Sequence, residues 1–226
     1  MPTSLVVLQL THLFWCRPER VVAAPNHGFL EGHDLVFADE LFAVFEQGGV
    51  PAAVAFVDDV IRDAKNVELA EGEVVEIGGY QMVSSGWANR TPWDTYREED
   101  EEDLEIRIRK ITDQVTAPPE RTIFSLHCPP YKSGLDDAPQ LTKDMHLKEA
   151  GRSTVPVGST AVRAAIEEHQ PCLGLHGHIH EAKGTTRIGR TLCINPGSSY
   201  EQGQLLGAVV DLDGKKKVKR FILTSG

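Results

Sequence analysis

The sequence contains few cysteines, and their spacing argues against a cysteine-based metal site. The chain has four, with no Cys-x-x-Cys pair, so a structural zinc knuckle is not expected. Cys128, Cys172 and Cys193 lie in or next to apolar segments, which favours buried, reduced thiols in a cytoplasmic protein. Cys128 also follows His127 directly, but this adjacency to a histidine is the only feature that supports a cysteine nucleophile.

Long apolar runs and an excess of basic charge are also missing. No run approaches the roughly 18 apolar residues of a membrane-spanning helix. The N-terminus has neither the basic region nor the apolar core of a signal peptide, so we expect a cytoplasmic protein with no membrane partner. The net charge of −10 argues against binding to a nucleic-acid backbone, which requires a basic face. A phosphate-bearing substrate is compatible with this charge if metal ions supply the positive potential.

The chain does have enough apolar material for one sizeable core. Hydrophobic residues make up 41% of its 226 residues and charged residues 25%, as in ordinary soluble domains. The sequence shows no internal repeat and no linker between domains. We therefore expect residues 1–226 to form a single domain.

Periodicity and turn signals predict alternating strands and helices. Leu104, Ile108 and Ile111 fall at helical spacing and predict a long helix, with the acidic residues 98–103 as its solvated first turns. Residues 132–156 are predicted to form a long polar loop of the kind that covers a site and selects substrates. Glycine-containing turns also predict three β-hairpins, around residues 78–79, 189 and 213–214.

The most informative segment is residues 171–180, where histidines follow a short apolar run. Residues 172–175 predict a buried strand, after which His176, His178 and His180 occupy alternate positions. Alternate side chains of an extended segment point the same way, so the three imidazoles would share one face. Imidazoles clustered where a strand enters a loop are suited to a divalent metal. A histidine-containing turn held by ordinary hydrogen bonds explains the pattern equally well.

A second predicted strand also ends in a histidine. Residues 122–126 predict a buried strand that leads into His127, and a helix capped near residue 159 lies between the two strands. Such a strand–helix–strand crossover places the strands parallel, with their carboxyl ends on one edge. His127, His178 and His180 would then converge at that edge, where open α/β sheets bind their ligands.

Four short motifs follow one another in the second half of the chain. They are His-Cys-Pro-Pro-Tyr at 127–131, Val-Pro-Val-Gly-Ser-Thr-Ala-Val-Arg at 155–163, Gly-His-Ile-His at 177–180 and Asn-Pro-Gly-Ser at 195–198. In this order they resemble the C-terminal half of a calcineurin-like metallophosphoesterase, and the match runs from about residue 50 to the end. The resemblance implies an α/β fold in which two mixed β-sheets form a sandwich flanked by helices (αββα), with a shortened or divergent N-terminal part.

The resemblance also implies a metal-dependent hydrolase that acts on a small phosphoester. In this family two metal ions bridged by a carboxylate activate a water for in-line attack on the phosphorus. By resemblance, His127 and His178 would bind the second metal and His180 the first. The expected ions are Mn²⁺, Fe²⁺ or Zn²⁺.

The N-terminal metal motifs of the family are degenerate or missing in this chain. Thr11-His12-Leu13-Phe14 stands where Asp-x-His is expected, no clear Gly-Asp motif is present, and Val57 replaces the asparagine ligand of the third motif. Asp58 occupies the position of a transition-state-stabilising residue and is the candidate catalytic residue. Without a bridging carboxylate, the imidazoles would hold one metal ion or none, because two adjacent cations repel strongly.

Three functions are therefore open at this point. The first is an active metallophosphoesterase, and the second is a catalytically inactive member of the family that serves as a binding or scaffold module. The third is a protein that binds a single metal ion without turnover. Metal stoichiometry and phosphodiester hydrolysis distinguish the three.

Overall fold

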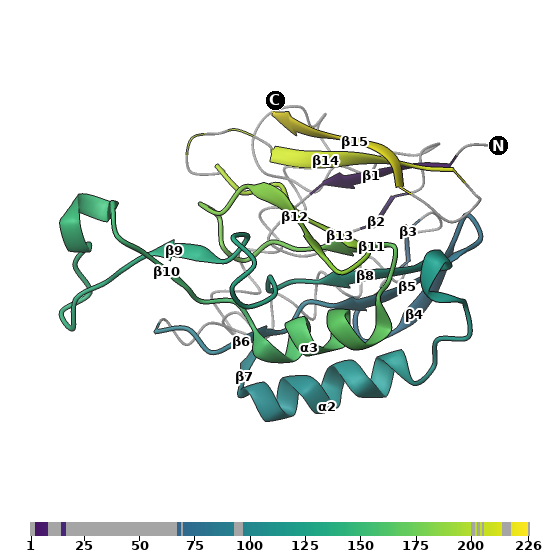
Figure 1. The fold of residues 1–226 in the computed structure, drawn as a ribbon, viewed down its shortest axis with the longest axis horizontal. Coiled ribbons are helices and arrows are strands. Elements are labelled where there is room, and N and C mark those ends of the chain that lie inside the picture. The colour runs from purple at the N-terminus through teal and green to yellow at the C-terminus, as the bar shows by residue number, and fades with distance from the viewer. Residues whose placement is uncertain are drawn as a thin grey trace, which may run out of the picture.

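Two β-sheets packed face to face form the centre of the molecule (Figure 1). The structure is a computed structural model that describes residues 70–92, 97–199, 202, 204, 206–213 and 218–225, with the backbone alone of 3–8, 15–16 and 67–68. The larger sheet has six strands, in the order β12 (Gly184–Ile188), β13 (Thr191–Asn195), β11 (Leu173–Leu175), β8 (Thr122–Leu126), β5 (Tyr80–Ser85) and β4 (Val74–Ile77). The smaller sheet consists of β1 (Thr3–Leu8), β14 (Leu206–Leu212) and β15 (Val218–Ser225).

The four central strands of the larger sheet run parallel, and the outer strands β12 and β4 are antiparallel to them. Helix α3 (Thr160–His169) lies in the connection from β8 to β11, so the predicted strand–helix–strand crossover is confirmed. The carboxyl ends of the parallel strands consequently lie along one edge, which we call the carboxyl edge. The strands end there at Ser85, Leu126, Leu175 and Asn195.

Each face of the larger sheet is buried against a different layer. In β8, Ile123 packs in a cluster with Ala208 of the smaller sheet. The next residue, Phe124, packs instead with Leu104 of helix α2 (Glu101–Thr112) and Ile166 of α3. This sheet–sheet–helix layering confirms the predicted α/β fold with a mixed central sheet flanked by helices. The described strands of the smaller sheet pair antiparallel.

Helix α2 has the predicted apolar face but begins later than the acidic run. Leu104, Ile108 and Ile111 are buried at helical spacing, as predicted. Residues 98–99 form instead the short strand β7 (Glu98–Glu99), paired with β6 (Ala88–Asn89). The prediction that the whole acidic run is a solvated helix start is therefore wrong at Glu98, which is buried.

The first residue of α2 caps the first turn of α3. The Glu101 carboxylate accepts hydrogen bonds from the N–H groups of Thr160 (3.1 Å) and Ala161 (2.9 Å) and from the Ser159 hydroxyl (2.7 Å). The Ser159 Oγ in turn accepts a hydrogen bond from the N–H of Val162 at 3.1 Å, as an N-cap residue does. A negative charge also suits the N-terminal end of a helix, so this contact fixes the two helices to one another.

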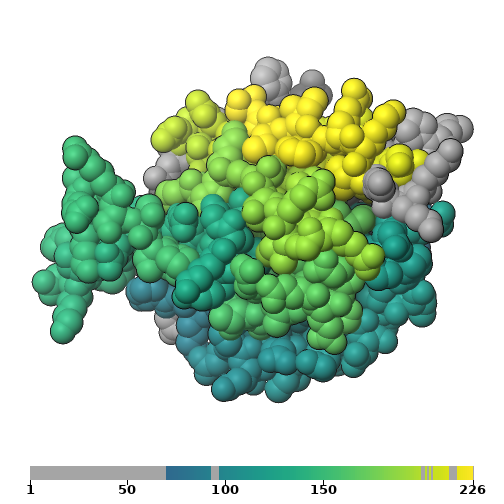
Figure 2. All heavy atoms as spheres, viewed as in Figure 1, coloured from purple at the N-terminus to yellow at the C-terminus, as the bar shows by residue number. Residues whose placement is uncertain are grey.

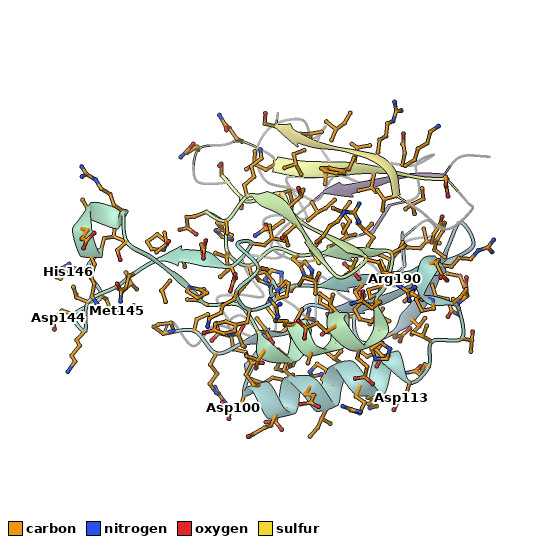
Figure 3. The ribbon with its side chains drawn as sticks, viewed as in Figure 1. Asp100, Asp113, Asp144, Met145, His146 and Arg190 are labelled. Carbon is orange, nitrogen blue, oxygen red and sulfur yellow. The ribbon has the colours of Figure 1, made fainter. Side chains whose placement is uncertain are left out.

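Residues 137–156, here called the arm, stand out from the body of the molecule (Figures 1 and 2). The arm contains a two-stranded sheet of β9 (Asp137–Pro139) and β10 (Thr154–Pro156) and the short helix η2 (Lys148–Gly151). It therefore has more regular secondary structure than the predicted polar loop. Figure 3 shows Asp144, Met145 and His146 at its far end. Met145 and Leu147 expose 46% and 56% of their surface there.

Asp136 fixes the root of the arm. Its side chain is fully buried and accepts hydrogen bonds from the backbone N–H groups of Lys132 (2.8 Å), Ser133 (2.9 Å), Gly134 (3.2 Å) and Gly158 (3.0 Å). A Cβ on Gly158 would lie 2.5 Å from the Pro129 carbonyl oxygen, so glycine is needed for this close approach. The segment that follows His127 is therefore held firmly against the start of α3.

The remaining elements are short connections. They are the strand pair β2 (Trp15–Cys16) and β3 (Val67–Glu68), and the helix η1 (Pro119–Arg121). The three predicted hairpins are confirmed as β4–β5, β12–β13 and β14–β15. None of the helices in the described ranges has the length and apolar character required to span a membrane. That the chain forms a single domain stays a prediction.

Candidate functional site

The carboxyl edge brings two of the three predicted histidines, His127 and His178, into contact. His127 follows β8 directly, and its N–H donates a hydrogen bond to the carbonyl of Ser85 at the end of β5 (2.9 Å). The N–H of Gly177 donates to the His127 carbonyl (2.8 Å). These bonds extend the parallel pairing beyond the strands and place the turn at 177–180, here called the histidine turn, beside His127.

The rings of His127 and His178 are in edge contact. Their centroids are 5.1 Å apart and their planes are inclined by 66°. His178 has a φ of +62°, in the left-handed region that a residue with a Cβ seldom adopts. Such a conformation costs on the order of 1 kcal/mol or more and is often found at functional sites, where surrounding contacts maintain it. Here the N–H of Ile179 donates to the Gly177 carbonyl at 2.6 Å and closes the turn.

The surroundings keep the imidazole of His178 neutral. Burial lowers its pKa, the nearby His180 lowers it further, and the negative charge of Glu98 raises it. The Glu98 carboxylate accepts hydrogen bonds from the Thr91 N–H (2.7 Å) and from the Thr91 hydroxyl (2.6 Å). A neutral imidazole is the form that ligates a metal ion.

One ring nitrogen of His178 finds no hydrogen-bond partner in the described part of the chain. Its Nε2 is buried and has no hydrogen-bond partner among the residues that the structure describes. A buried polar atom without a partner costs free energy, and such atoms are rare in folded proteins. The Nε2 of His176 is likewise buried without a partner among the described residues, so it is the contact with the His127 ring that makes His178 the candidate metal ligand.

His176 does not join the other histidines. Strand β11 ends at Leu175, and the His176 ring is buried with its Nδ1 at 2.9 Å from the Leu126 carbonyl. Burial lowers its pKa to about 4, so the ring is neutral near pH 7 and Nδ1 is assigned as the donor. Its Nε2 lies close to Gly174, where an added Cβ would approach it to 2.8 Å. The predicted shared face of three histidines is therefore not formed.

The Asn-Pro-Gly-Ser segment packs directly on the histidine turn. The N–H of Ser198 donates to the His180 carbonyl at 3.1 Å. Gly197 has a φ of +73°, and a Cβ there would lie 2.9 Å from the same carbonyl oxygen, so glycine is required on both grounds. The sequence indicated a loop after a strand, and the structure adds that this loop contacts the backbone of His180.

Other parts of the predicted site lie outside the described residues. Asp58, the candidate catalytic residue, is one of them, as are His12 and Val57 of the altered N-terminal motifs. Considering only the residues that the structure describes, no three or more His, Cys, Asp or Glu side chains are grouped so that they could hold a metal ion. A complete metal centre would therefore need ligands from other parts of the chain.

The cysteines next to the site have the properties of core residues. Cys128 is fully buried, and burial raises the pKa of its thiol to about 12. Cys193, in β13, is buried with its pKa raised to about 12 for the same reason. A nucleophilic cysteine needs a lowered pKa and access to substrate, so neither thiol fits that function.

At pH 8, we expect Cys128 and Cys193 of the folded protein to resist alkylation by iodoacetamide. A pKa of about 12 leaves a thiolate fraction on the order of 10⁻⁴ at that pH, and the thiolate is the reactive form. Peptide mass spectrometry after timed labelling measures the reaction at each cysteine, and labelling in urea provides the fully reactive control. Rapid labelling of Cys128 in the folded protein would contradict its assignment to the core.

Comparisons with known proteins show the fold. No family model matches the chain. An uncharacterised protein of Methanocaldococcus jannaschii is 29% identical over 142 residues, which cover 61% of this chain and 58% of that protein. One crystal structure superposes with a TM-score of 0.52 at 16% identity, covering 77% of this chain and 60% of the other. This chain thus spans about three fifths of the length of these relatives.

Two further crystal structures are less similar. A Thermus thermophilus protein has a TM-score of 0.45 at 17% identity, covering 78% of this chain and 66% of its own. A conserved uncharacterised Streptococcus pneumoniae protein, described as a predicted phosphoesterase, has a TM-score of 0.21 at 14% identity. It covers 56% of this chain and 91% of its own. At these identities the similarity extends to the fold at most, so the function must be argued from the site.

Proposed function

We propose that the protein is a metal-dependent phosphoesterase of the calcineurin-like type, with His127, His178 and His180 as metal ligands. The observation that carries the proposal is the buried Nε2 of His178, which lacks a partner among the described residues. The turn that holds it is strained, and the ring touches that of His127. The strained turn and a buried nitrogen without a partner in the described ranges both cost folding free energy, and binding of a metal ion would offset that cost.

The residues of this chain have distinct functions in the proposed reaction. A bound Mn²⁺, Fe²⁺ or Zn²⁺ would supply Lewis acidity and an activated water at the carboxyl edge. His127 and His178 would hold one such ion and His180 would bind the other, while Glu98 sets the electrostatic environment of His178. We assign Asp58 as a catalytic helper in this reaction and propose a small phosphoester as the substrate.

A non-catalytic binding module is the second candidate. It is favoured by the described part of the chain, in which no three potential ligands are grouped around one point. A single ion held by the imidazoles, without turnover, is the intermediate case. Each alternative predicts a different metal content, which makes the three separable by experiment.

Metal content and hydrolysis measured on the same preparation test the proposal. The protein is reconstituted with Mn²⁺, its metal content is determined by elemental analysis, and hydrolysis of bis-p-nitrophenyl phosphate is followed. Two ions per chain, with turnover that is lost with EDTA and restored by Mn²⁺, would support the proposal and would mean that residues outside the described ranges supply the missing ligands. One ion without turnover would identify the single-metal protein. No bound ion and no turnover would favour the binding module.

A further inference from the structure

The amide side chain of Asn195 lies between three segments of the carboxyl edge. Asn195 is the last residue of β13, and its side chain has no solvent exposure. Its Nδ2 is 2.9 Å from the Ile179 carbonyl and 3.1 Å from the Leu135 carbonyl, with that of Gly177 at 3.5 Å. Its Oδ1 accepts a hydrogen bond from the N–H of Gly197 at 2.9 Å.

These distances satisfy the polar groups of the Asn195 side chain. An amide nitrogen carries two hydrogens, so the two short contacts, to Ile179 and Leu135, are its principal hydrogen bonds. Both acceptors are backbone carbonyls, and that of Ile179 also accepts the N–H of Ala182 at 3.3 Å. A buried amide satisfied in this way adopts one orientation and imposes it on the groups it contacts.

The contact to Ile179 bears directly on the two histidines beside it. The Ile179 carbonyl belongs to the peptide group that links Ile179 to His180, and the Ile179 N–H belongs to the peptide group that links His178 to Ile179. The first is held by Asn195, and the second donates to the Gly177 carbonyl at 2.6 Å. The next carbonyl, of His180, accepts from Ser198 at 3.1 Å. Three successive peptide groups of the histidine turn are therefore fixed.

We propose that Asn195 is a positioning residue that sets the direction of the His178 and His180 side chains. It does so by joining the histidine turn to the end of β13 and, through Leu135, to the root of the arm. The metal-binding part of this proposal rests on the proposed function, whereas the orientation of the rings does not. Residues that orient metal ligands without touching the metal commonly change its affinity by roughly 10–100-fold when replaced.

The test compares two positions on the same strand. Asn195→Ala removes the amide. Asn195→Ser is a milder variant, and it provides the test if Asn195→Ala does not fold. Thr191→Val is the matched control, because Thr191 begins β13 at the opposite end. Like Asn195, it is fully buried, and its hydroxyl donates to the Pro171 carbonyl at 2.7 Å. It therefore also loses a buried hydrogen bond, but far from the carboxyl edge.

The first readout uses the metal-free protein labelled with ¹³C-histidine. The ring signals of His127, His178 and His180 are assigned by single substitutions, and the nuclear Overhauser contact between the His127 and His178 rings is recorded. We expect Asn195→Ser to shift the His178 and His180 signals and weaken that contact, and Thr191→Val to leave both unchanged. Unchanged ring signals in the Asn195 variants, with only a lower melting temperature, would overturn the proposal.

The second readout is the dissociation constant for Mn²⁺, measured by calorimetry. We expect it to rise roughly 10–100-fold in Asn195→Ser and to stay at the wild-type value in Thr191→Val. Equal affinity in all three proteins would contradict the positioning function. A wild-type protein that binds no Mn²⁺ would overturn the proposed function instead. The ring signals alone would then decide whether Asn195 positions the histidine rings.

Discussion

Replacing His178 by alanine is expected to lower the hydrolysis of bis-p-nitrophenyl phosphate by at least about 10²–10³-fold. The imidazole would hold the ion that polarises the phosphoryl group, and that interaction contributes several kcal/mol to the transition state. The pKa of His178 is lowered by burial, so the ring is available as a neutral ligand across the neutral pH range. Steady-state kinetics with Mn²⁺ present, together with the metal content of the variant, measure the effect.

His146→Ala provides the matched control for this experiment. His146 is exposed and lies at the far end of the arm (Figure 3), away from the carboxyl edge. Its removal should leave turnover and metal content unchanged. If His178→Ala hydrolysed the substrate at the wild-type rate, His178 would not be a ligand of the catalytic metal.

Replacing Asp136 by alanine is expected to reduce the free energy of unfolding by about 3–5 kcal/mol. Four backbone N–H groups donate to this carboxylate, and its side chain is fully buried. Hydrogen bonds to a charged group are each worth about 1.5–3 kcal/mol, and the donors left behind are only in part reached by water. Urea unfolding followed by circular dichroism measures the change.

Asp137→Ala removes the same charge from the adjacent residue. The Asp137 side chain is exposed, so its loss should change the free energy of unfolding by no more than about 0.5 kcal/mol. The two variants thus separate the effect of the buried hydrogen bonds from that of net charge. A similar loss in both would show that the hydrogen bonds of Asp136 contribute little.

The sheet and its carboxyl edge could be predicted because local patterns determine them. Apolar runs in β8 and β11 and a helix between them imply parallel pairing, and parallel pairing places His127 near the histidine turn. The helical spacing of Leu104 and Ile108 likewise requires only that one face of α2 be buried. These inferences hold because they depend on backbone geometry that the sequence pattern specifies.

The contacts that depend on strand ends and on distant residues could not be predicted. His176 follows a strand of only three residues, so the alternation that predicted a shared face stops before it reaches the ring. Glu98 belongs to an acidic run that indicates solvent exposure, yet its carboxylate is held by Thr91, seven residues earlier. The amide of Asn195 acts on residues 16 and 60 positions away, and no local pattern encodes such contacts.

The positive φ of His178 has a consequence for the stability of this chain. Glycine adopts that conformation without the steric penalty of a Cβ, so a glycine at this position would gain on the order of 1 kcal/mol of stability. Most proteins are only marginally stable, so a change of that size is a substantial part of their free energy of unfolding. A histidine in this backbone conformation is thus a cost to the stability of the folded chain.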